Sequence, residues 1–63
     1  MSPTEIRSSL KKRGYLMVDV ANECGRTLSA VRNSIYGLPF PSPAIRQHIS
    51  EILDKPIDAI WPE

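Results

Sequence analysis

The stretch that decides the fold is residues 17–37, MVDVANECGRTLSAVRNSIYG. Val20, Ala21 and Cys24 lie at positions i, i+1 and i+4, so they share one face of a first helix. Gly25 follows, because glycine adopts the left-handed conformation that ends a helix without a Cβ penalty. Two short helices joined by a turn that contains glycine form a helix-turn-helix, and we predict that motif here.

The second helix of the motif is predicted to begin after Thr27, whose side chain can accept a hydrogen bond from a free backbone N–H at a helix start. Val31, Ser34 and Ile35, at i, i+3 and i+4, form its inner face. Ala21 is the small residue expected where the two helices cross, because a larger side chain would hold them apart. In DNA-binding proteins the second helix of this motif lies in the major groove. We favour that interpretation over the alternative, a plain helical hairpin.

The length and composition exclude several classes of protein. A chain of 63 residues holds one domain, residues 1–63, near the lower size limit for a self-supporting core. Its one cysteine, Cys24, cannot form an intrachain disulfide, and a buried structural thiol is expected there. Neither a metal site nor a cofactor is expected, because the chain has one cysteine and one histidine, and His48 lies far from Cys24 in sequence. Without an apolar run of membrane-spanning length or a signal-peptide pattern, the expected location is the cytoplasm.

The charge is unevenly distributed along the chain. The formal net charge is only +1. Residues 1–46 nevertheless hold seven basic and three acidic residues, whereas residues 47–63 hold one basic and four acidic residues. This asymmetry is typical of a domain that turns one face towards phosphate groups and keeps the other face away from them.

The N-terminal residues predict another helix. Ser2 and Glu5 have the spacing of a capping box, and Gly14 is expected to end the helix. Ile6 and Leu10 form its buried stripe. Three cations precede the glycine: Lys11, Lys12 and Arg13. They either stabilise the dipole at the end of the helix or contact DNA phosphates, and the sequence leaves both roles open.

The C-terminal half predicts two further helices. The proline-rich segment 38–43 is expected to be a stiff, extended connection. An apolar stripe then predicts a helix to about residue 53, and a last short helix follows; the residues of these two helices expected in the core are Ile45, Ile49, Ile52, Leu53, Ile57, Ile60 and Trp61. No segment alternates apolar and polar residues as a strand does. The predicted fold is therefore all-α, a compact bundle of five short helices.

The outer face of the second motif helix carries the candidate functional residues. Subtracting its inward positions leaves side chains that can contact base edges: Leu28, Ser29, Arg32 and Asn33. The candidates for contacts to the DNA backbone are Lys11, Lys12, Arg13, Arg26, Thr27 and Tyr36. The alternative is that Arg32 and Asn33 are ordinary surface residues and Leu28 belongs to the edge of the core. Core positions are favoured for the aromatic Tyr36 and Phe40, and a surface or core-edge position is favoured for His48.

No enzymatic activity is predicted. The sequence contains no recognisable pair of catalytic carboxylates, no nucleophile elbow and no glycine-rich phosphate loop. A domain of this size would also form a water-excluding pocket with difficulty.

The chain resembles the Ner family of small phage and prophage DNA-binding proteins, within the lambda-repressor-like group. The matching features are the basic end of the first helix at residues 10–13, the Ala21–Gly25 spacing, residues 31–35, residues 49–53 and the ending Ile60-Trp61-Pro62. The resemblance implies a five-helix repressor of phage early promoters, with residues 27–36 as the recognition helix. Arg26 stands where such proteins usually carry an apolar turn residue.

Two classes of function are compatible with these patterns. The first is sequence-specific binding of double-stranded DNA for transcription regulation, with no membrane and no small-molecule substrate involved; a DNA-architectural or recombination accessory role differs from it only in purpose. The second is a helical adaptor that docks another regulator or a polymerase subunit, favoured by the low net charge and the apolar Leu28 and Leu38. No heptad marks a dimer interface, so we expect a monomer in solution or a weak dimer on DNA.

Overall fold

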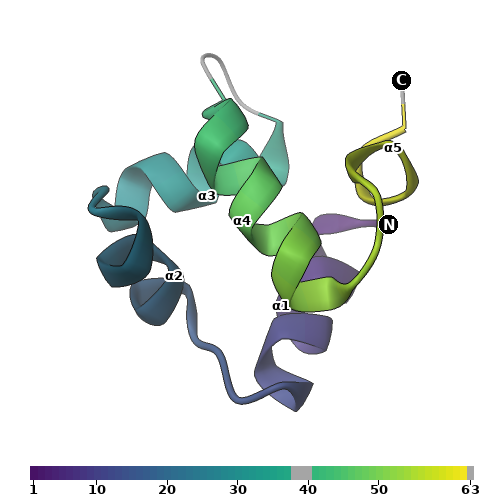
Figure 1. Ribbon diagram of the computed structural model, residues 1–63, viewed down its shortest axis with the longest axis horizontal. Coiled ribbons are helices and arrows are strands. Elements are labelled where there is room, and N and C mark those ends of the chain that lie inside the picture. Colours follow the sequence, from purple (N-terminus) through teal and green to yellow (C-terminus); the bar gives the residue numbers. More distant parts are fainter. Residues whose placement is uncertain (38–40, 63) are drawn as a thin grey trace.

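The computed structural model describes residues 1–37 and 41–62, which form five α-helices around one core (Figure 1). The helices are α1 (Pro3–Lys12), α2 (Met17–Cys24), α3 (Leu28–Tyr36), α4 (Pro43–Leu53) and α5 (Ile57–Ile60). These residues contain no β-strand. The prediction of an all-α bundle of five short helices is confirmed.

Helix α4 lies in the middle of the bundle and contacts each of the other four helices. Its apolar stripe (Ile45, Ile49 and Leu53) is fully buried, whereas Ile52 packs at the edge. The other helices place their own stripes against it; the buried residues that they contribute are Ile6, Leu10, Val20, Ala21, Val31, Ile35 and Ile60. Because each helix is amphipathic, none can bury its stripe except against the others, and the stripes converge on one core.

The helix ends follow the local sequence signals. Ser2 and Glu5 form the predicted capping box: the Ser2 Oγ accepts from the Glu5 N–H at 3.2 Å, and the Glu5 carboxylate accepts from the Ser2 N–H at 3.1 Å. At the starts of α3 and α4, the side chains of Thr27 and Ser42 each accept one hydrogen bond, from the N–H groups of Ala30 and Ile45. Asp54 ends α4 in the left-handed conformation, with φ of 54°.

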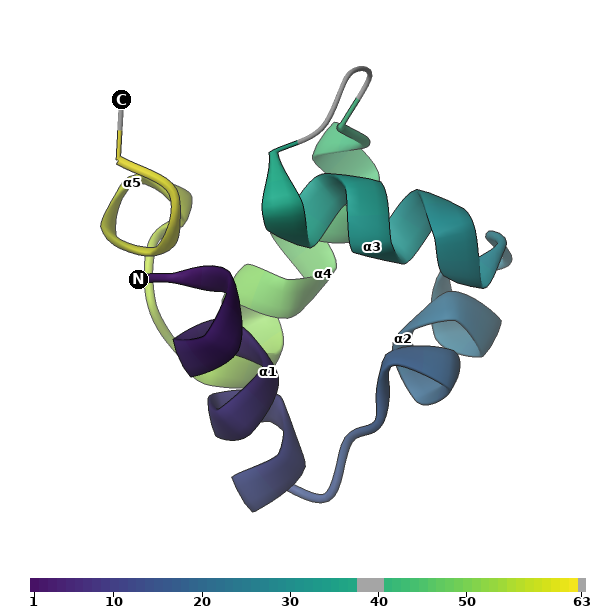
Figure 2. The same ribbon diagram turned by 180° about the vertical axis from the view of Figure 1, so that it is seen from behind.

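Helices α2 and α3 form the predicted helix-turn-helix, and Figure 2 shows them side by side. Gly25 ends α2 with φ of 65°, in the left-handed region, as expected from its sequence position. The Arg26 N–H donates to the Ala21 carbonyl at 2.9 Å and turns the chain towards Thr27. Ala21 itself is 3% exposed, consistent with a small residue between packed helices.

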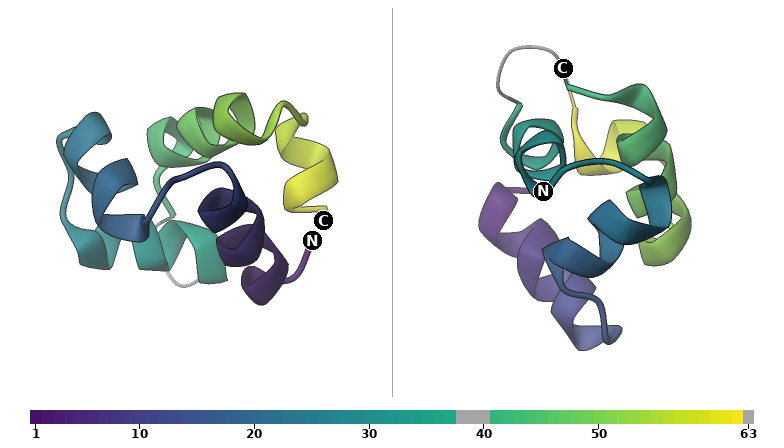
Figure 3. Two further views of the ribbon diagram at one scale, coloured as in Figure 1. Left: turned by 90° about the horizontal axis from the view of Figure 1, so that it is seen from below. Right: turned by 90° about the vertical axis from the view of Figure 1, so that its left-hand side faces the viewer.

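The N-terminus lies beside α5, at the other end of the chain (Figure 1, Figure 3). The amino group of Met1 donates to the Ile60 carbonyl at 2.9 Å. Met1 also packs against the core, so the segment before α1 is held against the end of α5.

Four positions differ from their predicted environments. Ile57 was predicted in the core, but it is only half-buried and is not part of the core cluster. Leu16 and Val20 are apolar residues at i and i+4, a spacing that predicts a pair on one helix face; in the structure Leu16 precedes α2 in extended conformation and is 57% exposed, so the pair does not form inside the helix. Tyr36 is 41% exposed and is no part of the core, because it occupies the outer side of the last turn of α3. Cys24 is half-buried at the core edge, and desolvation there raises the pKa of its thiol. The predictions for residues 38–40 of the proline-rich connection, Leu38 and Phe40 among them, fall outside the described residues.

Candidate nucleic-acid interface

The outer face of α3 presents most of the predicted base-contacting side chains to solvent. Leu28 is 44% exposed, Ser29 and Arg32 are exposed, and Asn33 is half-buried. This follows from the helix itself, since Val31, Ser34 and Ile35 point into the core and leave these positions on the opposite side. The first turn of α3 is therefore its most accessible part.

Helix α1 contributes an arginine to this face that the sequence analysis did not select. The Arg7 Nη1 donates to the hydroxyl of Tyr36 at 3.0 Å and so joins α1 to the last turn of α3. The available signal was the i, i+4 spacing of Arg7 and Lys11, which places both cations on one side of α1.

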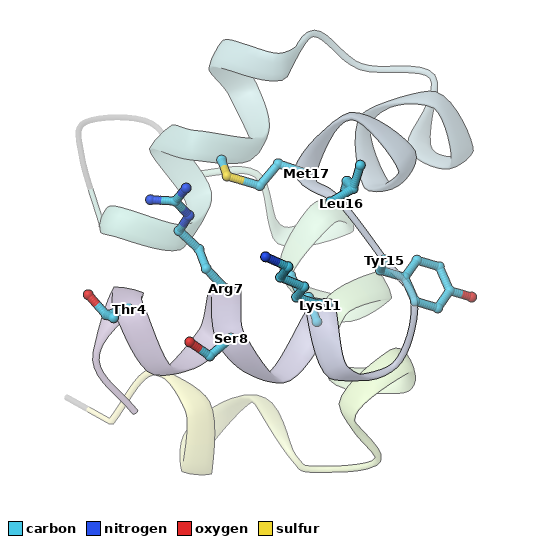
Figure 4. A pocket seen from close by; sticks show the side chains of 8 residues that line it. Thr4, Arg7, Ser8, Lys11, Tyr15, Leu16 and Met17 are labelled. Carbon is cyan, nitrogen blue, oxygen red and sulfur yellow. The ribbon is translucent and has the colours of Figure 1, made fainter.

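Two shallow surface hollows meet at Arg7 and Met17. The first, of about 300 Å³, follows α1, where Arg7 and Lys11 extend from the same side of the helix (Figure 4). The second, of about 340 Å³, brings these two residues together with Val18, Leu28 and Arg32. We call the surface formed by Arg7, Lys11, Met17, Val18, Leu28 and Arg32 the basic–apolar face.

The exposed large apolar side chains lie on or beside the basic–apolar face. Val18 (46% exposed) and Leu28 are part of it. Leu16 lines the first hollow with Lys11, and Tyr36 is bonded to Arg7. Apolar groups gathered at one place on a small domain are typical of a binding surface.

In the part of the chain that the structure describes, acidic side chains do not line either hollow. The two acidic residues of α2 lie elsewhere: Asp19 and Glu23 line a separate hollow with Tyr15. The carboxylate of Asp19 accepts a hydrogen bond from the Leu16 N–H at 2.8 Å, and the carboxylate of Glu23 pairs with the His48 Nε2 at 2.6 Å. His48, for which a surface or core-edge position was predicted, is half-buried and forms this contact between α2 and α4. Among the described residues, the hollows of the basic–apolar face are thus lined by cations and not by acidic side chains.

The structure separates the three cations at the end of α1. Lys11 joins the basic–apolar face, whereas Lys12 and Arg13 line another hollow with Leu53 and Lys55. Consecutive helical residues are rotated by about 100°, so three in a row cannot share one face. Of these three cations, only Lys11 belongs to the basic–apolar face with Arg32.

The turn before α3 holds two more predicted backbone contacts, Arg26 and Thr27, and both are exposed. The Thr27 Oγ1 accepts from the Ala30 N–H at 3.2 Å as the cap of α3. Its hydroxyl proton remains able to donate to a phosphate, because the capping bond uses only the oxygen lone pair.

Arg46 does not belong to the basic surface, although it was counted with the basic residues of positions 1–46. It is half-buried: its Nε donates to the Ser34 carbonyl at 3.1 Å, and its guanidinium lies over the Trp61 ring, 4.7 Å from the ring centre. A guanidinium engaged in this way supports α3 from behind instead of facing a phosphate.

The last turn of α3 is held by α4 and α5. The Trp61 indole donates to the Ile35 carbonyl at 3.2 Å, and Trp61 packs against the core as predicted. The Ser34 side chain is fully buried; its hydroxyl donates to the Ala30 carbonyl and accepts from the Ser42 N–H, both at 2.9 Å. The Ser34 and Ile35 carbonyls, which the helix end leaves without intrahelical partners, are thus bonded by Arg46 and Trp61, and these contacts help to hold the last turn of α3 in place.

Within residues 1–37 and 41–62, no group of three or more His, Cys, Asp or Glu side chains is arranged to hold a metal ion. No helix in the same residues is long and apolar enough to cross a membrane. Comparisons of the chain with protein-family models, with curated proteins and with solved structures found no match.

Proposed function

We propose that this protein binds double-stranded DNA in a sequence-specific manner and regulates transcription, with α3 in the major groove. The observation that carries the proposal is the basic–apolar face. Arg7, Lys11 and Arg32 surround exposed apolar side chains from both helices of the motif, and no acidic side chain of residues 1–37 and 41–62 lines the hollows there. Cations suit the phosphate backbone, and apolar groups suit thymine methyls in the major groove.

The side chains have distinct roles in this proposal. Arg32 donates two hydrogen bonds to guanine O6 and N7, and Leu28 and Ser29 contact neighbouring base edges. Asn33 is half-buried and stands at the margin of the base-contacting set. Arg7 and Lys11 bind phosphates on the α1 side, whereas Arg26 and Thr27 bind them at the positive end of the α3 dipole.

The wider proposal follows the resemblance to the Ner family. The protein is a lambda-repressor-like regulator of phage or prophage origin, without catalytic activity, acting at the nucleoid in a bacterial cytoplasm. It is a monomer in solution and pairs weakly on DNA.

A titration followed by ¹H–¹⁵N NMR tests the proposal. A short duplex of random sequence is added to the labelled chain at low salt, and the titration is repeated at higher salt. We expect the shift changes to concentrate at residues 7–11 and 26–36 and to fade with salt, because phosphate contacts release counterions. Unchanged spectra, or changes gathered at residues 49–61, would contradict DNA binding.

The second candidate is a protein-interaction adaptor, and the exposed Leu16, Val18 and Leu28 favour it. These side chains would fit a groove on another regulator or a polymerase subunit. An adaptor predicts binding that is insensitive to salt and independent of DNA, so the same pair of salt conditions distinguishes the two functions.

A further inference from the structure

The apolar part of the basic–apolar face has a defined position in the motif. Val18 and Leu28 line one hollow although they belong to different helices. Each lies in the first turn of its helix, α2 or α3. Both are close to half-exposed, at 46% and 44%. The two motif helices therefore present one composite apolar surface.

Two guanidinium-bearing residues border this surface, Arg7 from α1 and Arg32 from α3. The surface thus combines the methyl groups of Val18 and Leu28 with the positively charged hydrogen-bond donors of the two arginines. In the major groove of DNA, thymine is the base that presents a methyl group, while guanine presents the acceptor pair that arginine binds. A hollow with both kinds of side chain matches neighbouring thymine and guanine edges.

We propose that Val18 and Leu28 select a thymine by contact with its 5-methyl group, next to the base pair that Arg32 reads. The inference rests on the proposed DNA-binding function and names the base that the apolar surface recognises. Double-stranded DNA is favoured over an acidic protein surface as the occupant, because the cations continue beyond the hollow along α1 to Lys11, as a backbone contact requires.

Removing a single methyl group from the DNA tests the inference. The full chain first selects its preferred duplex from a random library, and each thymine of that duplex is then replaced in turn by deoxyuridine. At one position the substitution is expected to weaken binding about three- to fivefold, the effect of exposing one buried methyl group. At the other positions the affinity stays the same.

Protein variants connect the methyl group to the hollow. In Leu28→Ala the deoxyuridine penalty at that position disappears, and Val18→Ala reduces it. Leu16→Ala is the matched control, because Leu16 is 57% exposed but does not line this hollow, and it keeps the full penalty. All three positions are exposed, and circular dichroism verifies that each variant is folded.

The outcomes separate this inference from the proposed function. If the chain binds duplexes in a salt-dependent manner but no deoxyuridine substitution changes affinity, or selection yields no preferred sequence, thymine selection is wrong and DNA binding stands. The same conclusion holds if the penalty persists unchanged in Leu28→Ala. If no duplex binds at low salt, both proposals are overturned, and an acidic protein surface becomes the occupant of the hollow.

Discussion

The two ends of α3 have opposite environments. At its start, Leu28, Ser29 and Arg32 face solvent. At its end, the carbonyls of Ser34 and Ile35 are bonded by Arg46 and Trp61. One helix of nine residues thus has an exposed half and an anchored half.

Along one helix, this difference separates the side chains that we propose to contact DNA from those that hold the helix in the bundle. Contacts from α4 and α5 hold the last turn, whereas the first turn packs against α2 and leaves the outer sides of Leu28 and Ser29 exposed. A recognition helix needs such rigidity, because base contacts are discriminating only when the side chains are held in position. Substitutions at the two ends should therefore have different effects: stability at the anchored end, and DNA affinity at the exposed end.

The largest effect is expected from shortening a buried side chain of α3. Ile35→Ala removes a side chain that is 1% exposed and should lower the free energy of unfolding by about 2–5 kcal/mol. In a domain of this size such a loss leaves much of the chain unfolded. Leu28→Ala on the exposed half should change stability by less than about 0.5 kcal/mol. Thermal unfolding followed by circular dichroism measures both; equal losses would mean that the two halves do not differ.

A pair of arginines separates recognition from support directly. Arg32→Ala should reduce discrimination at one base pair by about 1–3 kcal/mol and leave the melting temperature nearly unchanged. Arg46→Ala should do the reverse, because Arg46 bonds the Ser34 carbonyl and packs on Trp61. Affinities for a set of single-base variants of a selected duplex give the comparison. An equal loss from Arg32→Ala on every sequence would count against direct readout.

The indole hydrogen bond at the anchored end is expected to have a moderate effect. Trp61→Phe keeps an aromatic ring but removes the donor to the Ile35 carbonyl, which should cost about 0.5–1.5 kcal/mol in urea denaturation. The matched control is Tyr36→Phe, which removes an exposed hydroxyl bonded to Arg7. Tyr36→Phe should lower the free energy of unfolding by less than Trp61→Phe, because water can replace an exposed hydrogen-bond partner. A larger loss for Tyr36→Phe would mean that Tyr36, and not Trp61, holds the last turn of α3.

Two neighbouring lysines sharpen the definition of the exposed surface. Lys11→Ala should reduce the slope of log affinity against log salt by about one, since Lys11 lies on the basic–apolar face, where we propose that it contacts one phosphate. Lys12→Ala should leave the slope unchanged, because Lys12 lines a different hollow with Lys55. Equal effects of the two substitutions would show that the DNA extends around the end of α1.

The smallest effect concerns the start of α1, the helix that supplies Arg7. Hydrogen bonds from the Ser2 backbone and side chain lower the pKa of the Glu5 carboxyl from its ordinary value of 4.5. A lowered pKa means that this group stabilises the fold fully above its unfolded pKa and loses that contribution as the pH falls through the folded pKa. The melting temperature of the wild type should exceed that of Glu5→Ala at pH 7, and the difference should shrink below about pH 4. A constant difference would mean that the carboxylate charge has no role in the cap.

Most of the fold follows from local sequence signals. Local signals of this kind are the capping serine at position 2, the glycine at position 25 and the apolar stripe of residues 45–53. Each one determines the conformation of residues close to it in sequence, so the structure that it forms can be predicted without knowledge of tertiary contacts. The exposed face of α3 follows from helical periodicity in the same way. The exposed positions of Leu16 and Tyr36 could not be predicted in this way. An apolar residue at a helix end can face either the core or the solvent, and tertiary packing decides between the two.

By itself, the sequence determined the all-α class, the five helices, the turn between α2 and α3 and the core stripes, because these depend on periodicity, caps and backbone freedom near each residue. Only the tertiary structure decided which cations share a surface. It separated Lys11 from Lys12, brought Arg7 to Tyr36 and placed Arg46 behind α3. The physical reason is that packing between residues far apart in the chain sets the orientation of one helix against another. That orientation decides whether charged side chains from different helices lie on the same surface.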